Sequence, residues 1–256
     1  MTDTARPPAR RRPGPVSPAR AWRLTHALVW RQLVTRGRLL ALGLLGAVSV
    51  IVGWAVGVSS EVYDHHRAAV DVTNALGLTL VVPIVALVFA SAAFGDLRDD
   101  GTLVYLWLRP LDRWPLVAGA WSASVTVAVP VALVPVVATA AVARGGGQVV
   151  VASLVAGAAG IVAYSAAFVL LGLLVRRAIV WGLAYIIVWE GIAGSLGKTA
   201  ARLAVRGYTR SILADRTGTE LAHADLGWVT ALVVCLVAVV ALVAVAAVRL
   251  SRLDVD

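Results

Sequence analysis

The sequence predicts an all-α membrane protein with six transmembrane helices, and three observations lead to that fold class. Of the 256 residues, 60% are hydrophobic and only 14% are charged, whereas soluble domains average about 25% charged residues. The mean hydropathy is +0.86. The apolar residues gather in six runs, each long enough to cross or nearly cross a bilayer. This composition excludes a cytosolic enzyme and a disordered chain, and the single cysteine, Cys235, excludes an intramolecular disulfide.

The chain begins with a basic segment that precedes the first apolar run. Residues 1–20 are rich in proline and arginine and predict a disordered tail, which leaves 21–256 as a single transmembrane domain. A cleaved signal peptide is the less favoured alternative, because the basic segment continues to Arg38 and the apolar run after it is long enough to span. Residues 21–38 carry Trp22 and Trp30 among arginines, which favours a position in the lipid headgroups.

The six apolar runs predict the membrane spans. They lie at about residues 39–58, 75–94, 115–143, 149–175, 178–196 and 226–248. At 1.5 Å per residue, each covers or nearly covers a hydrocarbon core of about 30 Å. Gly53 and Gly57 in the first run form a GxxxG pattern, which permits close helix packing and is weak evidence for a dimer face. Pro130 and Pro135 predict a kink in the third.

The distribution of arginine predicts the orientation. Sixteen of the 23 basic residues fall in the N-terminal segment, the 95–114 loop, the turn at Arg176 and Arg177, and the C-terminal end. The other seven fall on the opposite side. Basic residues accumulate in cytoplasmic loops, so we expect a multi-pass protein of the cell membrane with both termini in the cytoplasm. The arginines are then lipid anchors, and no nucleic-acid partner is expected.

A basic stripe precedes the last run. Lys198, Arg202, Arg206 and Arg210 recur every four residues, with apolar and aromatic residues on the opposite face. This pattern predicts an amphipathic helix at the membrane surface, in contact with lipid. A solvated loop helix is the alternative.

Motifs for catalysis are incomplete. The segment 191–199 is close to a P-loop but has five residues between its glycines, where the phosphate cradle needs four. We therefore expect no catalytic residue, cofactor or metal on this chain, and any ATP and Mg chemistry would have to come from another chain. His65 and His66 lie beside Glu61 and Asp64 and could bind a metal, but without a second ligand pair a solvated loop is favoured.

Glu190 is the only acid inside a predicted span. It lies 13 residues after Arg177, about 20 Å along a helix, and therefore in the outer third of the bilayer. Acids in membranes are costly and are functional candidates by default. One interpretation is a substrate-pathway or gating acid. The favoured interpretation is a structural ion pair with Lys198 or Arg202.

The loop between the second and third runs contains a further candidate interaction site. Three acids precede Gly101, and Thr102 can cap a short helix that Pro110 ends. That helix would present an apolar face made by Leu103, Leu106 and Trp107, which a partner protein could bind. The alternative is a plain interfacial loop.

This loop resembles that of ABC-2-type ABC transporter permeases, which has an acid before Gly-Thr-Leu, a leucine-rich turn, a proline and a following arginine. The matching residues are Asp99, Gly101, Thr102, Leu103, Leu106, Pro110 and Arg113. This chain has Ala120 and Trp121 where the family often has a lysine. The segment 185–191 also resembles the fifth span of a subgroup of these permeases.

The resemblance implies the transmembrane subunit of a bacterial ABC exporter. It would form a homodimer or a heterodimer with a second permease and would couple to a separate ATP-binding subunit. Residues 21–38 would be an interfacial elbow helix, 95–113 a cytoplasmic coupling helix, and 190–213 would contain short re-entrant helices. Asp96, Asp99 and Asp100 would lie at the rim of the ATPase contact.

The transported substrate is not indicated, and this chain alone is expected to have no enzymatic activity. Two alternatives remain: an intramembrane enzyme that uses Glu190, and a non-transporting membrane scaffold. The first needs a second catalytic group at the depth of Glu190, and the sequence reveals none.

Overall fold

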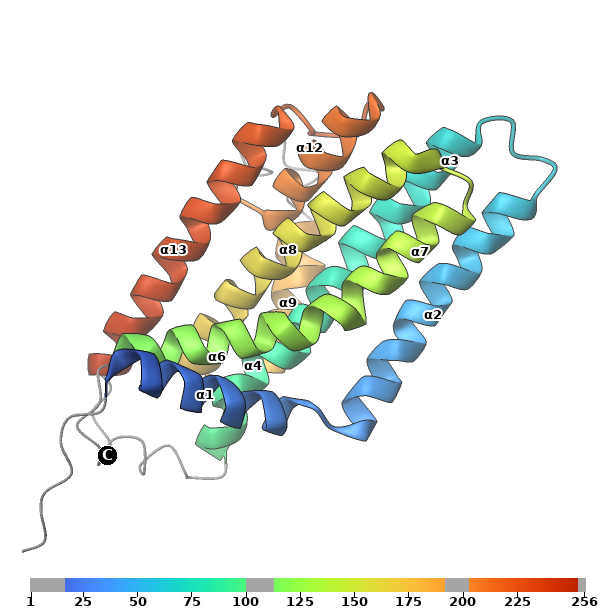
Figure 1. The fold of residues 1–256 in the computed structure, drawn as a ribbon. Coiled ribbons are helices and arrows are strands. Elements are labelled where there is room, and N and C mark those ends of the chain that lie inside the picture. The colour runs from blue at the N-terminus through green and yellow to red at the C-terminus, as the bar shows by residue number, and fades with distance from the viewer. Residues whose placement is uncertain (1–16, 100–112, 192–202, 253–256) are drawn as a thin grey trace, which may run out of the picture.

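Helices make up the fold of this chain. The computed structural model describes residues 17–99, 113–191 and 203–252, and within these ranges there is no strand. Five of the described helices are long and apolar enough to cross a membrane, which indicates a multi-pass membrane protein (Figure 1). They are Arg36–Val58, His65–Asp96, Arg113–Val142, Gly146–Leu174 and Trp228–Arg252. The expected fifth span appears as a shorter apolar helix, Ala178–Glu190.

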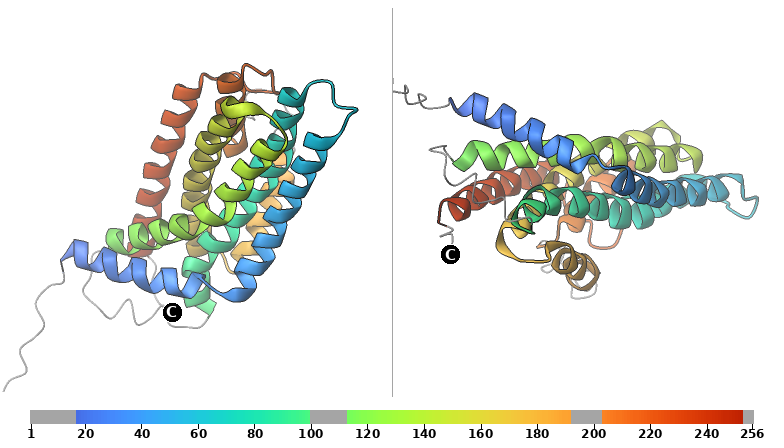
Figure 2. Two further views of the ribbon diagram at one scale, coloured as in Figure 1. Left: turned by 45° about the vertical axis from the view of Figure 1, so that its right-hand side comes forward. Right: turned by 90° about the horizontal axis from the view of Figure 1, so that it is seen from below.

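The first helix, α1 (Pro18–Leu33), lies across one end of the bundle (Figures 1 and 2). Its buried residues Ala21, Val29 and Leu33 share one face, because side chains four residues apart lie above one another. This face packs on α6 (Arg113–Ala128), while Trp22 and Trp30 are exposed. A helix of this kind suits the membrane interface. Residues 18–20, assigned above to the tail, belong to this helix.

The second helix, α2 (Arg36–Val58), packs closely on α7 (Val134–Val142) through its glycines. A Cβ atom on Gly53 would lie 2.9 Å from the Thr139 carbonyl oxygen, and one on Gly57 would overlap the carbonyl oxygen of Val142. Ser49 and Thr139 are joined by a hydrogen bond of 2.9 Å between their hydroxyls. The GxxxG pattern therefore serves contact within the chain, where backbones need small residues to approach.

Replacing Gly57 with alanine should destabilise this seam. Because the backbone of α7 occupies the space of the new methyl group, we expect the free energy of unfolding to fall by about 1–3 kcal/mol. The measurement is the melting temperature of the purified protein in detergent. Gly43→Ala is the matched control, since a Cβ there meets nothing within 4 Å. Equal melting temperatures for both variants would contradict the close contact.

The third span bends, as its prolines predict. The α-helix α6 passes into a wider turn, η2 (Val129–Leu133), before α7 begins. Pro130 lies inside that turn, and because proline has no N–H to donate, the regular hydrogen-bond pattern is broken there. The ribbon changes direction between α6 and α7 (Figure 1).

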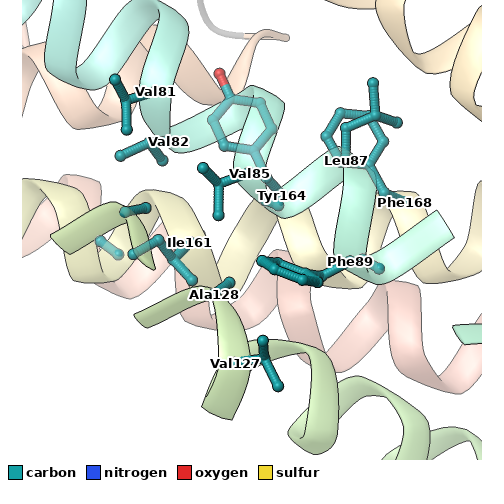
Figure 3. Close-up of a cluster of buried hydrophobic side chains, with 14 of the residues drawn as sticks. Val81, Val82, Val85, Leu87, Phe89, Val127, Ala128, Ile161, Tyr164 and Phe168 are labelled. Carbon is teal, nitrogen blue, oxygen red and sulfur yellow. The ribbon is translucent and has the colours of Figure 1, made fainter. Parts of the chain in front are cut away.

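The long helix α8 (Gly146–Leu174) is the centre of the bundle. It contacts α4 (Val82–Asp99), α7, α13 (Trp228–Arg252) and α12 (Val205–Thr217). Figure 3 shows Ile161, Tyr164 and Phe168 of α8 beside Val85 and Phe89 of α4. These side chains have almost no exposed surface. By contrast, α2 and α13 expose much of their apolar surface, as lipid-facing helices do.

The helix α12 lies along the half of α8 that is farthest from α1 (Figure 1). At its C-terminal end, Gln148 Nε2 donates to the Arg216 carbonyl oxygen at 2.7 Å. Nearer its start, Thr209 contacts Gly160 in the middle of α8. The helix therefore runs from mid-bundle to the end opposite α1. The short helices α3 (His65–Val72), η1 (Thr73–Val81), α9 (Ala178–Ala184) and η3 (Tyr185–Glu190) complete the fold.

Candidate functional site

Glu190, the last residue of η3, is buried inside the bundle, with only 2% of its surface exposed. Its Oε2 atom accepts a hydrogen bond of 2.5 Å from the hydroxyl of Tyr164. Tyr164 belongs to α8 and is fully buried. A buried carboxyl group is costly unless its oxygens have hydrogen-bond partners. The Tyr164 hydroxyl on α8 is such a partner, and lipid hydrocarbon offers none.

Aromatic rings surround this hydrogen bond. Phe168 stacks on Tyr164, with 5.8 Å between the ring centroids, and meets the ring of Tyr185 edge-on at 6.2 Å. The hydroxyl of Tyr185 also interacts with the Glu190 carboxyl group. Three rings from α8 and η3 therefore hold Glu190 in a fixed, water-poor position.

Arg206, in the first turn of α12, brings a positive charge to the same place. Its Nη1 atom donates to the backbone carbonyl oxygen of Glu190 at 3.5 Å, and its guanidinium attracts the carboxyl group electrostatically. Glu190 Oε1 and Arg206 Nε are both buried without a hydrogen-bond partner among the described residues. The arrangement is a buried carboxyl group beside a half-buried guanidinium, and the hydrogen-bonding capacity of both groups is only partly used.

Arg210 lies one turn later on α12 and also points into the protein. Its Nε atom donates to Asn74 Oδ1 of η1 at 3.3 Å. The backbone oxygen of Asn74 accepts from the Thr79 hydroxyl at 2.8 Å, which fixes that segment. Arg206 and Arg210 are half-buried and bind internal acceptors on η3 and η1, while the surface stripe stays a prediction.

The other two members of the expected stripe, Lys198 and Arg202, lie outside the described residues. The ion pair expected between one of them and Glu190 stays a prediction. Sequence reasoning missed Tyr164, Tyr185 and Asn74 as partners of the charged groups. The available signal was the presence of polar side chains inside apolar runs, but spacing does not say which of them meet.

An apolar groove of about 560 Å³ adjoins this cluster. It is formed by α8, η3, the start of α12 and the middle of α13. Phe168 and Tyr185 line it, together with Tyr208 and Cys235. Its volume lies in the range of about 300–1,000 Å³ that is typical of small-molecule sites. The groove brings an apolar surface next to buried polar groups.

The described members of the expected coupling set, Asp96, Asp99 and Arg113, lie at the end of the bundle that α1 crosses (Figure 1). Asp99 ends α4 and Arg113 begins α6. Asp96 pairs with Arg38 of α2 at 2.8 Å and stays partly exposed, and its place at the rim of an ATPase contact stays a prediction. The remaining coupling residues, Asp100, Gly101, Thr102, Leu103, Leu106, Trp107 and Pro110, fall outside the described segments.

His66, in the segment where the sequence allows a metal site, contacts the backbone of two other segments. Within the described ranges, no group of three or more histidine, cysteine or acidic side chains could hold a metal ion. Both ring nitrogens of His66 face backbone oxygens, those of Gly145 and Thr217, each at 3.2 Å. His66 therefore ties three segments of the bundle together. In comparisons with known proteins, no family model matches this chain and no curated protein is significantly similar to it.

Proposed function

We propose that this chain is the transmembrane subunit of an ATP-driven exporter related to ABC-2-type permeases. It forms the substrate pathway as a dimer with an identical or second permease, and a separate subunit binds and hydrolyses ATP. The observation that carries the proposal is the Gly-Thr-Leu loop pattern between Asp99 and Arg113. Both ends of that loop lie at the end of the bundle that α1 crosses (Figure 1).

The arrangement of the helices gives further support. The resemblance implies an elbow helix at 21–38 and short helices within 190–213, and the helices α1 and α12 lie largely in these stretches. The apolar groove beside Glu190 is suited to an amphipathic molecule. The exposed apolar faces of α2 and α13 are available to lipid or to a second permease.

The proposal requires six crossings, with the α1 end in the cytoplasm, and cysteine labelling can test this. In a Cys235→Ala background, Arg176→Cys and Glu220→Cys bracket the short fifth helix, and both positions are exposed. A membrane-impermeant maleimide should label position 220 in intact cells and position 176 only after the cells are permeabilised. Labelling of both from the same side would exclude the sixth crossing.

The intramembrane enzyme is the second candidate, and one observation favours it. An enzyme would need a second catalytic group at the depth of Glu190, and the Tyr164 hydroxyl is a polar group at that depth. Tyr164 has no exposed surface, however, and its hydroxyl already donates to Glu190. This geometry suits a partner that stabilises the acid better than a group that meets a substrate.

Co-expression with the ATPase encoded beside its gene tests the proposal directly. We expect the full chain, purified in mild detergent, to carry the ATPase through affinity and size-exclusion steps and to hydrolyse ATP. An ATPase with its Walker A lysine replaced should still bind but should not hydrolyse ATP. A chain that purifies without any ATPase, even after co-expression, would contradict the proposal.

A further inference from the structure

A second cavity lies at the α1 end of the molecule, apart from the Glu190 cluster. It measures about 240 Å³. One wall is the C-terminal part of α4, from Ser91 to Asp96, and the other is the turn that joins α8 to α9, at Arg176 and Arg177. Viewed from below, α9 stands at the margin of the bundle (Figure 2), and its first residues, Ala178, Ile179 and Val180, line the cavity.

The described side chains that line this cavity carry a surplus of positive charge. Its one described acid, Asp96, is already neutralised by Arg38 at 2.8 Å. Arg176 and Arg177 are exposed and form no ion pair with any described residue. Two adjacent arginines therefore line a small cavity whose other walls are largely apolar, and each guanidinium can donate several hydrogen bonds to an anion.

An exposed apolar surface continues from the same cavity along α9. Ile179 and Val180 line the cavity and are 49% and 62% exposed, and Trp181 is 61% exposed. Such side chains are stable in contact with hydrocarbon, and tryptophan favours the headgroup boundary. The cavity therefore has cationic groups at its aqueous end and an apolar wall that leads into the bilayer.

We propose that this cavity binds one anionic phospholipid of the cytoplasmic leaflet. Arg176 and Arg177 hold the phosphate, and the acyl chains lie along the exposed face of α9. Basic pockets between transmembrane helices on the cytoplasmic side bind anionic headgroups in this way. The lipid fills the space between α4 and the start of α9 and fixes α9 to the bundle. This inference does not depend on the transport function.

Lipid titration of the full chain tests the proposal. The protein is delipidated in detergent and titrated with phosphatidylglycerol or phosphatidylcholine, and bound lipid is counted by native mass spectrometry. We expect one phosphatidylglycerol to bind at least tenfold more tightly than phosphatidylcholine. Arg176→Gln and Arg177→Gln together should remove this preference, because each arginine near an anionic headgroup contributes roughly fivefold to affinity.

The chain offers a closely matched control. Arg144 lies in the turn between α7 and α8, is exposed at the opposite end, and has φ 61°, close to the 59° of Arg177. Arg144→Gln should leave the preference for phosphatidylglycerol unchanged. Gly95→Leu keeps both arginines but fills the cavity, since a Cβ at Gly95 meets nothing within 4 Å, and it should weaken binding about tenfold.

Three outcomes would overturn the proposal. The first is unchanged phosphatidylglycerol binding in the double arginine variant and in Gly95→Leu. The second is an equal loss in Arg144→Gln, which would mean that the whole positive surface attracts the lipid. The third is displacement of the lipid by millimolar inorganic phosphate, which would mean that the site binds free anions and the acyl chains contribute nothing.

Discussion

Replacing Leu106 or Trp107 with aspartate should abolish co-purification of the ATP-binding subunit. The P-loop-like segment 191–199 is incomplete, so in the proposed exporter ATP hydrolysis would drive transport through contact with another subunit. In the predicted coupling helix, Leu103, Leu106 and Trp107 share one face. Apolar residues at the centre of an interface carry most of its affinity, and an aspartate there would be buried without a partner.

The control for these variants is Asp99→Asn. Rim charges mainly adjust association rate and register, so we expect this change to weaken the complex only modestly. None of the three positions lies in a predicted span, and yield and size-exclusion profiles in detergent should therefore match the wild type. If both aspartate variants retain the ATPase and its activity, the loop is not the coupling element, and the main reason for proposing an ABC exporter is lost.

Replacing Glu190 with glutamine should lower the stability of the protein and leave its ATP-driven activity largely intact. The amide can still accept from Tyr164, but the negative charge that offsets Arg206 is lost. We expect a loss of about 1–3 kcal/mol, typical of a buried polar group that loses its partner. The melting temperature in detergent and ATP hydrolysis by the complex are the two measurements.

A double-mutant cycle measures the interaction between Glu190 and Arg206 separately from their contacts with other residues. Adding Arg206→Gln to Glu190→Gln removes both charges, so the combined loss should be smaller than the sum of the single losses. Glu220→Gln, at an exposed position, is the control and should leave the melting temperature unchanged. Full stability of Glu190→Gln together with lost activity would instead make Glu190 a pathway acid.

Composition and the length of the apolar runs were sufficient to predict the long helices. A backbone in hydrocarbon must satisfy its own hydrogen bonds, so long apolar runs become helices whatever packs beside them. Five of the six predicted runs are long described helices. The remaining run, at 178–196, is a shorter apolar helix that is described as far as Glu190. The bend near Pro130 also follows from one residue, because a missing N–H is a local property.

Contacts between helices could not be predicted in the same way. The glycines at 53 and 57 indicated a close approach, but only the fold shows that α7 is the partner. The spacing of Arg206 and Arg210 places them on one helix face, but only the fold shows that they bind the Glu190 backbone and Asn74. Helical spacing specifies which residues share a face, and the packing of the other helices decides what that face meets.

The sequence by itself determined that this is a helical membrane protein, where its five long apolar helices lie, and that Glu190 is an acid inside an apolar run. Only the tertiary structure decided that Tyr164, 26 residues earlier on another helix, donates to that acid, and that Asp96 is paired with Arg38. The reason is physical. Burial of the backbone in lipid acts residue by residue along the chain, whereas a buried charge is stabilised by whichever polar group the packed helices bring within reach.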